Sequence, residues 1–194
     1  QMIRTGVASI AGHVVVQGKG YEASGDLDIV VEDSGRVAGL LDSAVTAEGV
    51  VLRRAFLGGL LISTDGSSAA VVSAIEPEKD RKVGKFHDYL HTGEWLSENR
   101  DILLGSGLAE TLGVELGDKI VYMMQVDEEM TSKLFRVKGI LRTGAADQDG
   151  IMAAITLEAS QELRGGADDA TQVVMILEDF SEWPNALVQA QEVL

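Results

Sequence analysis

The segment 101–124, DILLGSGLAETLGVELGDKIVYMM, has a pattern of apolar and polar positions that predicts strand, turn, helix, turn and strand. The apolar run Ile102 to Leu104 ends at Gly105-Ser106-Gly107, as a buried strand does where it meets a turn. A short helix is expected next, because apolar residues recur at steps of one, three and four: Leu108, Ala109, Leu112 and Leu116. Glycines end this helix, and Ile120 to Met124 has the character of the next strand.

The first part of the chain predicts a strand followed by a helix. His13 to Gln17 is a β-branched run bounded by glycines, which is typical of a strand. From Asp26 we expect a helix, because one helical face collects apolar residues: Leu27, Val30, Val31, Ala38 and Leu41. Acidic residues in its first turns suit the positive end of the helix dipole.

Residues 45–76 are rich in Val, Ile, Leu, Ser and Thr, which predicts several strands joined by hairpins. Turn signals stand at Gly58-Gly59 and at Asp65-Gly66-Ser67. Val50 to Ile62 can equally be one long, bent strand.

The middle of the chain predicts a helix and, further on, a hairpin. Phe86 and Leu90 are spaced four apart, which indicates a helix of about two or three turns that Gly93 ends. Residues 120–141 predict a hairpin, because a polar and acidic stretch separates two apolar ones. Its tip is expected at Asp127 to Thr131.

The end of the chain repeats the order of its beginning. It predicts in turn a strand, a short helix, a buried strand and a helix: Ile151 to Leu157, Glu158 to Leu163, Thr171 to Leu177 and Ser181 to Leu194. Strand 13–17 and strand 171–177, each with its helix, would then form similar units on either side of a middle insertion. The pattern predicts an α+β fold.

Composition is typical of a globular protein: the 194 residues are 45% hydrophobic, with a mean hydropathy of +0.11. The net charge of −15, from 31 acidic and 16 basic residues, disfavours partners that present phosphates or anionic headgroups, so we expect no nucleic-acid partner. The chain has no cysteine, which excludes disulfides, thiolate metal sites and a cysteine nucleophile. A chain without cysteine fits a reducing or an oxidising compartment.

The ends of the chain predict a domain excised from a longer protein. No apolar run reaches the roughly 18 to 20 residues that span a bilayer, and the first residues lack the apolar core of a signal peptide. The chain begins at Gln, and it stops within an amphipathic pattern of Trp183, Leu187, Ala190 and Leu194.

The sharpest local motif is His87-Asp88-Tyr89-Leu90-His91, since two histidines four residues apart on a helix can bind zinc from one face. Asp88 stands where HExxH metalloproteases carry a Glu as general base, and Glu94 or a more distant residue would be the third ligand. Gly93 ends the expected helix at once, and a chance His pair on a solvated helix face is the simpler interpretation. A zinc-dependent hydrolase built on His87 and His91 is therefore the alternative function.

The Gly105-Ser106-Gly107 turn does not match the motifs that it resembles. In a dinucleotide-binding GxGxxG loop the third glycine would be Glu110, whose charge repels a pyrophosphate at a helix N-terminus. A nucleophile elbow needs glycines two residues before and after the Ser, where this chain has Leu104 and Leu108. We expect a tight turn with a structural role.

Other charged clusters predict solvated surface. The acidic pairs Glu128-Glu129 and Asp168-Asp169 stand in expected turns. The basic run from Lys79 to Lys85 is expected on the solvated face of a helix.

Several stretches of the chain resemble one known family. They are GEWLSENRDILLGSGLAETLGVELGDKIVYMM, then LFRVKGIL after a hairpin, then IMAAITLEASQEL, with GHVVVQGKGY near the start. Over essentially its whole length the chain resembles the extracytoplasmic domain of the MacB, FtsX and LolC/LolE type of ABC transporter permease.

In this family the domain stands between the first two transmembrane helices, so the resemblance implies a place on the periplasmic or extracytoplasmic face of the bacterial inner membrane. It implies two subdomains: a porter-like βαβ part from residues 1–56 and 151–194, and an inserted, mixed sabre-like part from residues 57–150. It also implies a mechanical function in which a cytoplasmic ATPase subunit moves the membrane helices. The external domains of two permeases, a second copy or a paralogue, then transmit this motion to a periplasmic or extracellular substrate or carrier protein. No catalytic residue and no cofactor are implied.

In the lipoprotein-releasing subgroup, the permease recruits its carrier through an extended, Pro-containing hairpin at the place of Gln125 to Lys133. The hairpin of this chain is short and has no Pro, so carrier recruitment does not follow and the substrate is unassigned. We expect the tip residues Asp127, Glu128, Glu129 and Met130 to contact a partner, with a solvated turn as the alternative. A free-standing ligand-binding module is a third hypothesis, and it would need a sizeable apolar pocket.

Overall fold

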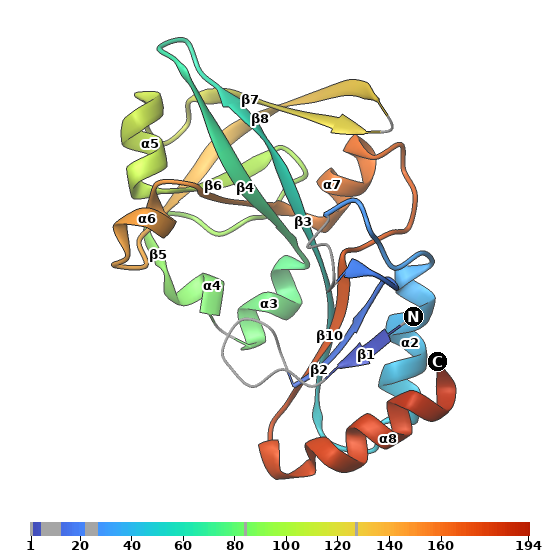
Figure 1. The fold of residues 1–194 in the computed structure, drawn as a ribbon. Helices are drawn as coiled ribbons and strands as arrows, with labels where there is room; N and C mark the ends of the chain where they lie inside the picture. Colours follow the sequence, from blue (N-terminus) through green and yellow to red (C-terminus); the bar gives the residue numbers. More distant parts are fainter. Residues whose placement is uncertain (1, 5–12, 22–26, 84, 127) are drawn as a thin grey trace. The chain divides into compact units, whose positions relative to one another are not determined.

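The computed structural model describes residues 2–4, 13–21, 27–83, 85–126 and 128–194 (Figure 1). It has the predicted α+β character and divides into two compact units. Unit 1 is taken from residues 1–55, 78–85 and 167–194, and unit 2 from residues 56–77 and 86–166. The predicted third segment, 151–194, is thus divided, with 151–166 in unit 2.

Unit 1 contains an antiparallel sheet in the order β1-β2-β10-β3. Its strands are β1 (Met2–Arg4), β2 (Val14–Gln17), β10 (Gln172–Leu177) and the first half of β3 (Gly49–Ile62). Two segments from opposite ends of the chain therefore lie side by side, since β2 pairs with β10 from Gln172 opposite Gln17 to Met175 opposite Val14.

Helices cover both faces of this sheet. Helices α2 (Ser34–Ala44) and α8 (Trp183–Val193) pack in one core with alternate strand residues such as Val14, Val16 and Val173. The other face carries Val15, Leu52 and Val174, and Val83 of α3 (Pro77–Val83) packs against it. The alternation of strand residues between two cores explains why these strands are apolar almost throughout.

The helix expected from Asp26 begins later than predicted, at Ser34. Asp26 lies outside the described residues, Val31 forms an isolated bridge with Ala170, and Asp33 has a left-handed φ of 48°. The prediction was wrong because residues 27–31 precede the helix, and Val31 enters the core of unit 1 from a bridge position rather than from a helical face.

Unit 2 contains six strands whose pairings close on themselves, in the order β3, β4, β9, β6, β8, β7 and back to β3. The new strands are β4 (Ser67–Ile75), β6 (Asp101–Gly105), β7 (Lys119–Val126), β8 (Glu129–Leu141) and β9 (Met152–Thr156). Two of the pairs, β4 with β9 and β6 with β8, are parallel, and the result is a mixed barrel-like sheet.

Side chains of the barrel strands alternate between its inside and a second core outside. Ile102 and Leu104 of β6 are fully buried, while Leu103 between them joins an outer cluster with Phe86, Trp95 and Leu141. Helices α5 (Ser106–Leu112), α6 (Ala146–Asp149) and α7 (Leu157–Leu163) and the strand β5 (Leu90–Gly93) complete the unit. The 3-10 helix η1 (Phe180–Glu182) belongs to unit 1.

The pairing of β9 in the barrel explains why the predicted third segment, 151–194, is divided between the two units. Strand β9 pairs with β4 from Val71 opposite Met152 to Ile75 opposite Thr156, and with β6 at Leu103 opposite Ala154. Because both neighbours of β9 are barrel strands, residues 151–166 belong to unit 2 rather than with the terminal helix.

The central unit predicted over 101–124 is confirmed as β6, α5 and β7, and the hairpin over 120–141 is confirmed as β7 and β8. The single long strand is also confirmed, as β3. The turn at Gly58-Gly59 is wrong, because both glycines lie within β3. Among the described residues, no helix is long and apolar enough to cross a membrane.

Candidate functional site

The predicted partner contact lies at the end of the β7–β8 hairpin. Val126 is opposite Glu129, so β7 ends at Val126 and β8 begins at Glu129. Glu128 has a left-handed φ of 69°, a conformation that is common in tight hairpin turns. Glu129 and Met130 therefore lie in β8 rather than in the turn, and Asp127 lies outside the described residues.

The described residues of the tip are exposed. Met130 has 64% of its surface accessible and stands opposite Gln125, while Glu128 and Glu129 are also exposed. An exposed methionine side chain is flexible and can adapt to an apolar surface of a partner, with the neighbouring carboxylates at the edge of the contact. Whether a partner binds these residues stays a prediction.

A chain of polar contacts holds the base of the hairpin against α7. Lys133 of β8 forms an ion pair with Glu162, and the Asn99 side-chain amide donates to the same carboxylate at 3.3 Å. The Thr156 hydroxyl in turn donates to Asn99 at 2.9 Å and accepts from the Ala159 N–H at the start of α7. The hydrogen bond from Lys133 lowers the pKa of Glu162, so this carboxylate is ionised at neutral pH.

This network was not predicted from the sequence. Lys133 and Glu162 are 29 residues apart, and each stands in a pattern that predicts an ordinary exposed position. The fold brings β8 beside α7, and no local sequence pattern predicts the Lys133–Glu162 pair.

The zinc hypothesis assumed that His87 and His91 share one helix, and this is wrong. His87 lies in the short helix α4 (Lys85–Asp88), whereas His91 lies in β5. His87 packs edge-on against Trp95 with 5.2 Å between the ring centroids. Within the described part of the chain, no group of three or more His, Asp or Glu side chains could hold a metal ion.

The glycines of the Gly105-Ser106-Gly107 turn serve close packing, as expected. A Cβ at Gly105 would overlap the carbonyl oxygen of Asp149, and one at Gly107 would lie 3.2 Å from the backbone of Gly150. Asp149 itself accepts hydrogen bonds from the backbone and the hydroxyl of Thr143, at 2.8 Å each, which lower the pKa of its carboxyl. The turn therefore lets α6 approach the strand and leaves no space for a phosphate.

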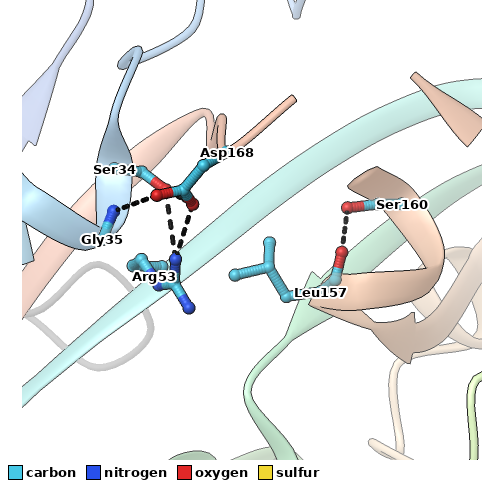
Figure 2. Close-up of polar contacts among 6 residues, drawn as sticks. All are labelled: Ser34, Gly35, Arg53, Leu157, Ser160 and Asp168. Carbon is cyan, nitrogen blue, oxygen red and sulfur yellow. Dashed lines mark hydrogen bonds and ion pairs between the residues drawn. The ribbon is translucent and has the colours of Figure 1, made fainter. Parts of the chain in front are cut away.

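The pair Asp168-Asp169 is not a set of solvated loop charges, and this prediction was wrong. Figure 2 shows Asp168 accepting from the Ser34 hydroxyl and the Gly35 N–H, at 3.1 and 3.0 Å, and pairing with Arg53 at 2.8 Å. A carboxylate at the first turn of α2 satisfies free N–H groups and the helix dipole. Asp169 is buried.

The basic run from Lys79 to Lys85 also departs from prediction in part. Asp80, within this run, is 1% exposed and pairs with Arg54 of β3, which is 3% exposed. One face of α3 is therefore anchored in unit 1 by a buried ion pair.

Comparisons with known proteins give two kinds of similarity. One stretch is 30% identical over 98 residues to the lipoprotein-releasing system transmembrane protein LolC of Neisseria meningitidis serogroup B, covering 46% of this chain. That stretch covers 24% of LolC, so the chain spans about a quarter of the length of the curated relative that it matches. No model of a known protein family matches the chain.

Solved structures share the fold at low identity. The periplasmic region of MacB from Actinobacillus actinomycetemcomitans superposes with a TM-score of 0.66 at 14% identity, over 92% of this chain and 81% of that one. The extracellular domain of the noncanonic ABC-type transporter YknZ from Gram-positive bacteria gives a TM-score of 0.60 at 13% identity, over 89% of this chain and 86% of that one.

Proposed function

We propose that this chain, whose fold matches that of the MacB periplasmic region, is an extracytoplasmic domain of the MacB/LolC type of ABC transporter permease. In this role it would transmit ATP-driven motion of membrane helices to a substrate or partner protein outside the membrane. The observation that carries the proposal is the extent of the match: the fold of the MacB periplasmic region covers 92% of this chain and therefore both units.

The proposed mechanism assigns a role to each unit. Unit 1 is the porter-like part, made from both ends of the chain, and its β2 and β10 lie side by side. Motion of the membrane helices would reach unit 1 first, because this unit contains both ends of the chain. Unit 2 is the inserted sabre-like part and carries the hairpin. The expected boundary at residue 56 belongs to this proposal, whereas the second boundary is taken at residue 166, where unit 2 ends, rather than at residue 150.

The proposed contact with the partner is the tip of the hairpin, with Glu128, Glu129 and Met130. Their exposure supports it, as does the Lys133–Glu162 ion pair, which holds the base of the hairpin to α7. A hairpin fixed at its base can pass on a displacement, whereas a loosely held one would absorb it. ATP hydrolysis belongs to a separate subunit or domain, and the second permease is another copy or a paralogue.

The experiment measures motion in the full-length permease, together with its ATPase, in lipid nanodiscs. Because this stretch has no cysteine, spin labels can be placed at Glu128→Cys in unit 2 and Glu48→Cys in unit 1. We expect the distance distribution between the labels to differ between the nucleotide-free and the vanadate-trapped states. In the isolated domain the same nucleotides should leave the distribution unchanged. Identical distributions in both states of the full transporter would contradict the proposal.

A further inference from the structure

The first half of β8 has one open edge. The Arg136 N–H donates to the carbonyl of Arg100 at 2.7 Å, on the side of β6, whereas the Val137 N–H donates to Asp118 at 2.9 Å, on the side of β7. Successive residues of a strand direct their N–H and C=O groups to opposite sides. The backbone groups of Ser132 and Leu134 therefore face the β6 side. Strand β6 begins only at Asp101, opposite Arg136, and among the described strands β7 alone pairs with residues 129–135 of β8.

A cavity of about 350 Å³ lies along this edge. Its lining includes the consecutive residues 131–134 of β8, together with Arg100, Glu162 and Leu163. A cavity on one face of a sheet would be lined by alternate residues, because side chains alternate between the faces. Contact with four consecutive residues indicates that the cavity runs beside the backbone edge. It therefore occupies the place where another strand could pair with β8.

The cavity is cationic in a protein of net charge −15. Lys133 and Glu162 compensate each other as an ion pair. The Arg100 guanidinium also lines the cavity, and its charge helps to lower the pKa of Glu162, after the larger contribution of Lys133. The lining thus carries two cations and one carboxylate, a net charge of +1, beside a row of backbone donors and acceptors. Leu134, 47% exposed, and Leu163 add apolar contact area.

We propose that this edge is a binding site for an extended peptide segment of a partner protein, which pairs with β8 at Ser132 and Leu134 and brings an Asp or Glu carboxylate to Arg100. Addition of a strand to a free sheet edge uses main-chain hydrogen bonds for affinity and side-chain contacts for specificity. The backbone edge favours a peptide over a small anion, because an anion would use Arg100 alone. The inference does not depend on a transport role, since every group belongs to unit 2 of this chain.

The test uses the ¹⁵N-labelled domain and a pool of acetylated, amidated pentapeptides with Glu at the centre and Val, Ile, Thr, Tyr or Phe on both sides. The control pool carries Lys at the centre. In the free domain, the amides of Ser132 and Leu134 should exchange with deuterium faster than those of Lys133 and Phe135, which face β7. With the Glu pool, the Ser132 and Leu134 amides should shift and exchange about tenfold more slowly, while the Lys133 and Phe135 amides change little.

Variants separate the carboxylate contact from strand pairing. Arg100→Gln should reduce the preference for the Glu pool over the Lys pool to about one, while Arg142→Gln, an exposed arginine of the same unit, should keep it. The proposal is overturned if the Ser132 and Leu134 amides are already protected in the free domain. It is equally overturned if millimolar Glu pool leaves these amides unchanged, or if both pools bind the wild type equally.

Discussion

The substitution Gly59→Ala tests the closure of the barrel in unit 2. Gly59 immediately precedes the three residues of β3 that pair with β7, Leu60 to Ile62. A Cβ at Gly59 would lie 2.5 Å from the Met123 carbonyl oxygen, 2.5 Å from Cε2 of Tyr122 and 2.6 Å from its hydroxyl oxygen. Ordinary contacts between heavy atoms are about 3.5 to 4.0 Å. The methyl group therefore has to displace the backbone of β7 or the fully buried ring of Tyr122.

Overpacking of this kind costs about 1 to 3 kcal/mol, and we expect the upper half of that range because a backbone atom is among the obstacles. For a chain of this size the melting temperature should fall by roughly 4 to 12 °C. Urea unfolding followed by circular dichroism gives the free energy. Gly66→Ala is the matched control, since a Cβ there meets nothing within 4 Å, and it should stay within about 0.5 kcal/mol of wild type.

A second substitution, Tyr122→Phe, tests which atoms cause the loss of stability expected for Gly59→Ala. The Tyr122 hydroxyl is buried without a hydrogen-bond partner among the described residues, and burial raises its pKa. Its removal should leave the domain as stable as before or stabilise it by about 1 kcal/mol. It should also reduce the cost of Gly59→Ala without abolishing it, because the Met123 carbonyl remains. Equal stabilities of Gly59→Ala and Gly66→Ala would refute the close approach of β7 to β3.

The remaining predictions concern three polar contacts, all measured by urea unfolding. Arg54→Met should destabilise the domain by about 3 to 5 kcal/mol, because it removes the ion pair that Arg54 forms with the buried Asp80 carboxylate. Adding Asp80→Leu should recover more than half of this loss, and no recovery would contradict a buried pair. Asp168→Ala should lower the free energy of unfolding by about 1 to 2 kcal/mol, because it removes the carboxylate that caps α2. A change near zero would contradict this capping role. The folded pKa of Glu162 is lowered, so its pair with Lys133 stabilises the fold above the ordinary carboxyl pKa, and this stabilisation is lost as the pH falls through the folded pKa. The difference in stability between wild type and Glu162→Gln should therefore disappear on acidification. The pair is exposed and contributes at most about 1 kcal/mol, and a difference that does not depend on pH would contradict the prediction.

The sequence predicted those parts of the fold that local patterns determine. The strand, helix and strand of 101–124 were found because an apolar run, a helical face and glycines succeed one another without a break. The long strand β3 was found as one of two interpretations. The turn at Gly58-Gly59 failed because glycine marks a close approach of another backbone as well as a turn, and in Gly59 the neighbour is β7.

The parts that could not be predicted depend on pairs far apart in the chain. The start of α2 is set by Asp168, 134 residues from Ser34, and no window around Asp26 to Ser34 contains that carboxylate. The closed pairing of β7 with β3 and the open edge of β8 likewise arise from strand order rather than from the residues of either strand. The zinc prediction from His87 and His91 failed because a four-residue spacing puts two side chains on one face only within a helix. The chain changes from α4 to β5 between these two residues.

The most direct test of the central claim is the side of the membrane on which this domain lies in the full-length protein. A single cysteine at Ser67, an exposed residue of β4, serves as the target in a background from which any cysteines outside this stretch have been removed. Spheroplasts are treated with a membrane-impermeant maleimide, with and without detergent permeabilisation. An extracytoplasmic permease domain predicts full labelling of Ser67→Cys before permeabilisation, and labelling only after permeabilisation would contradict it.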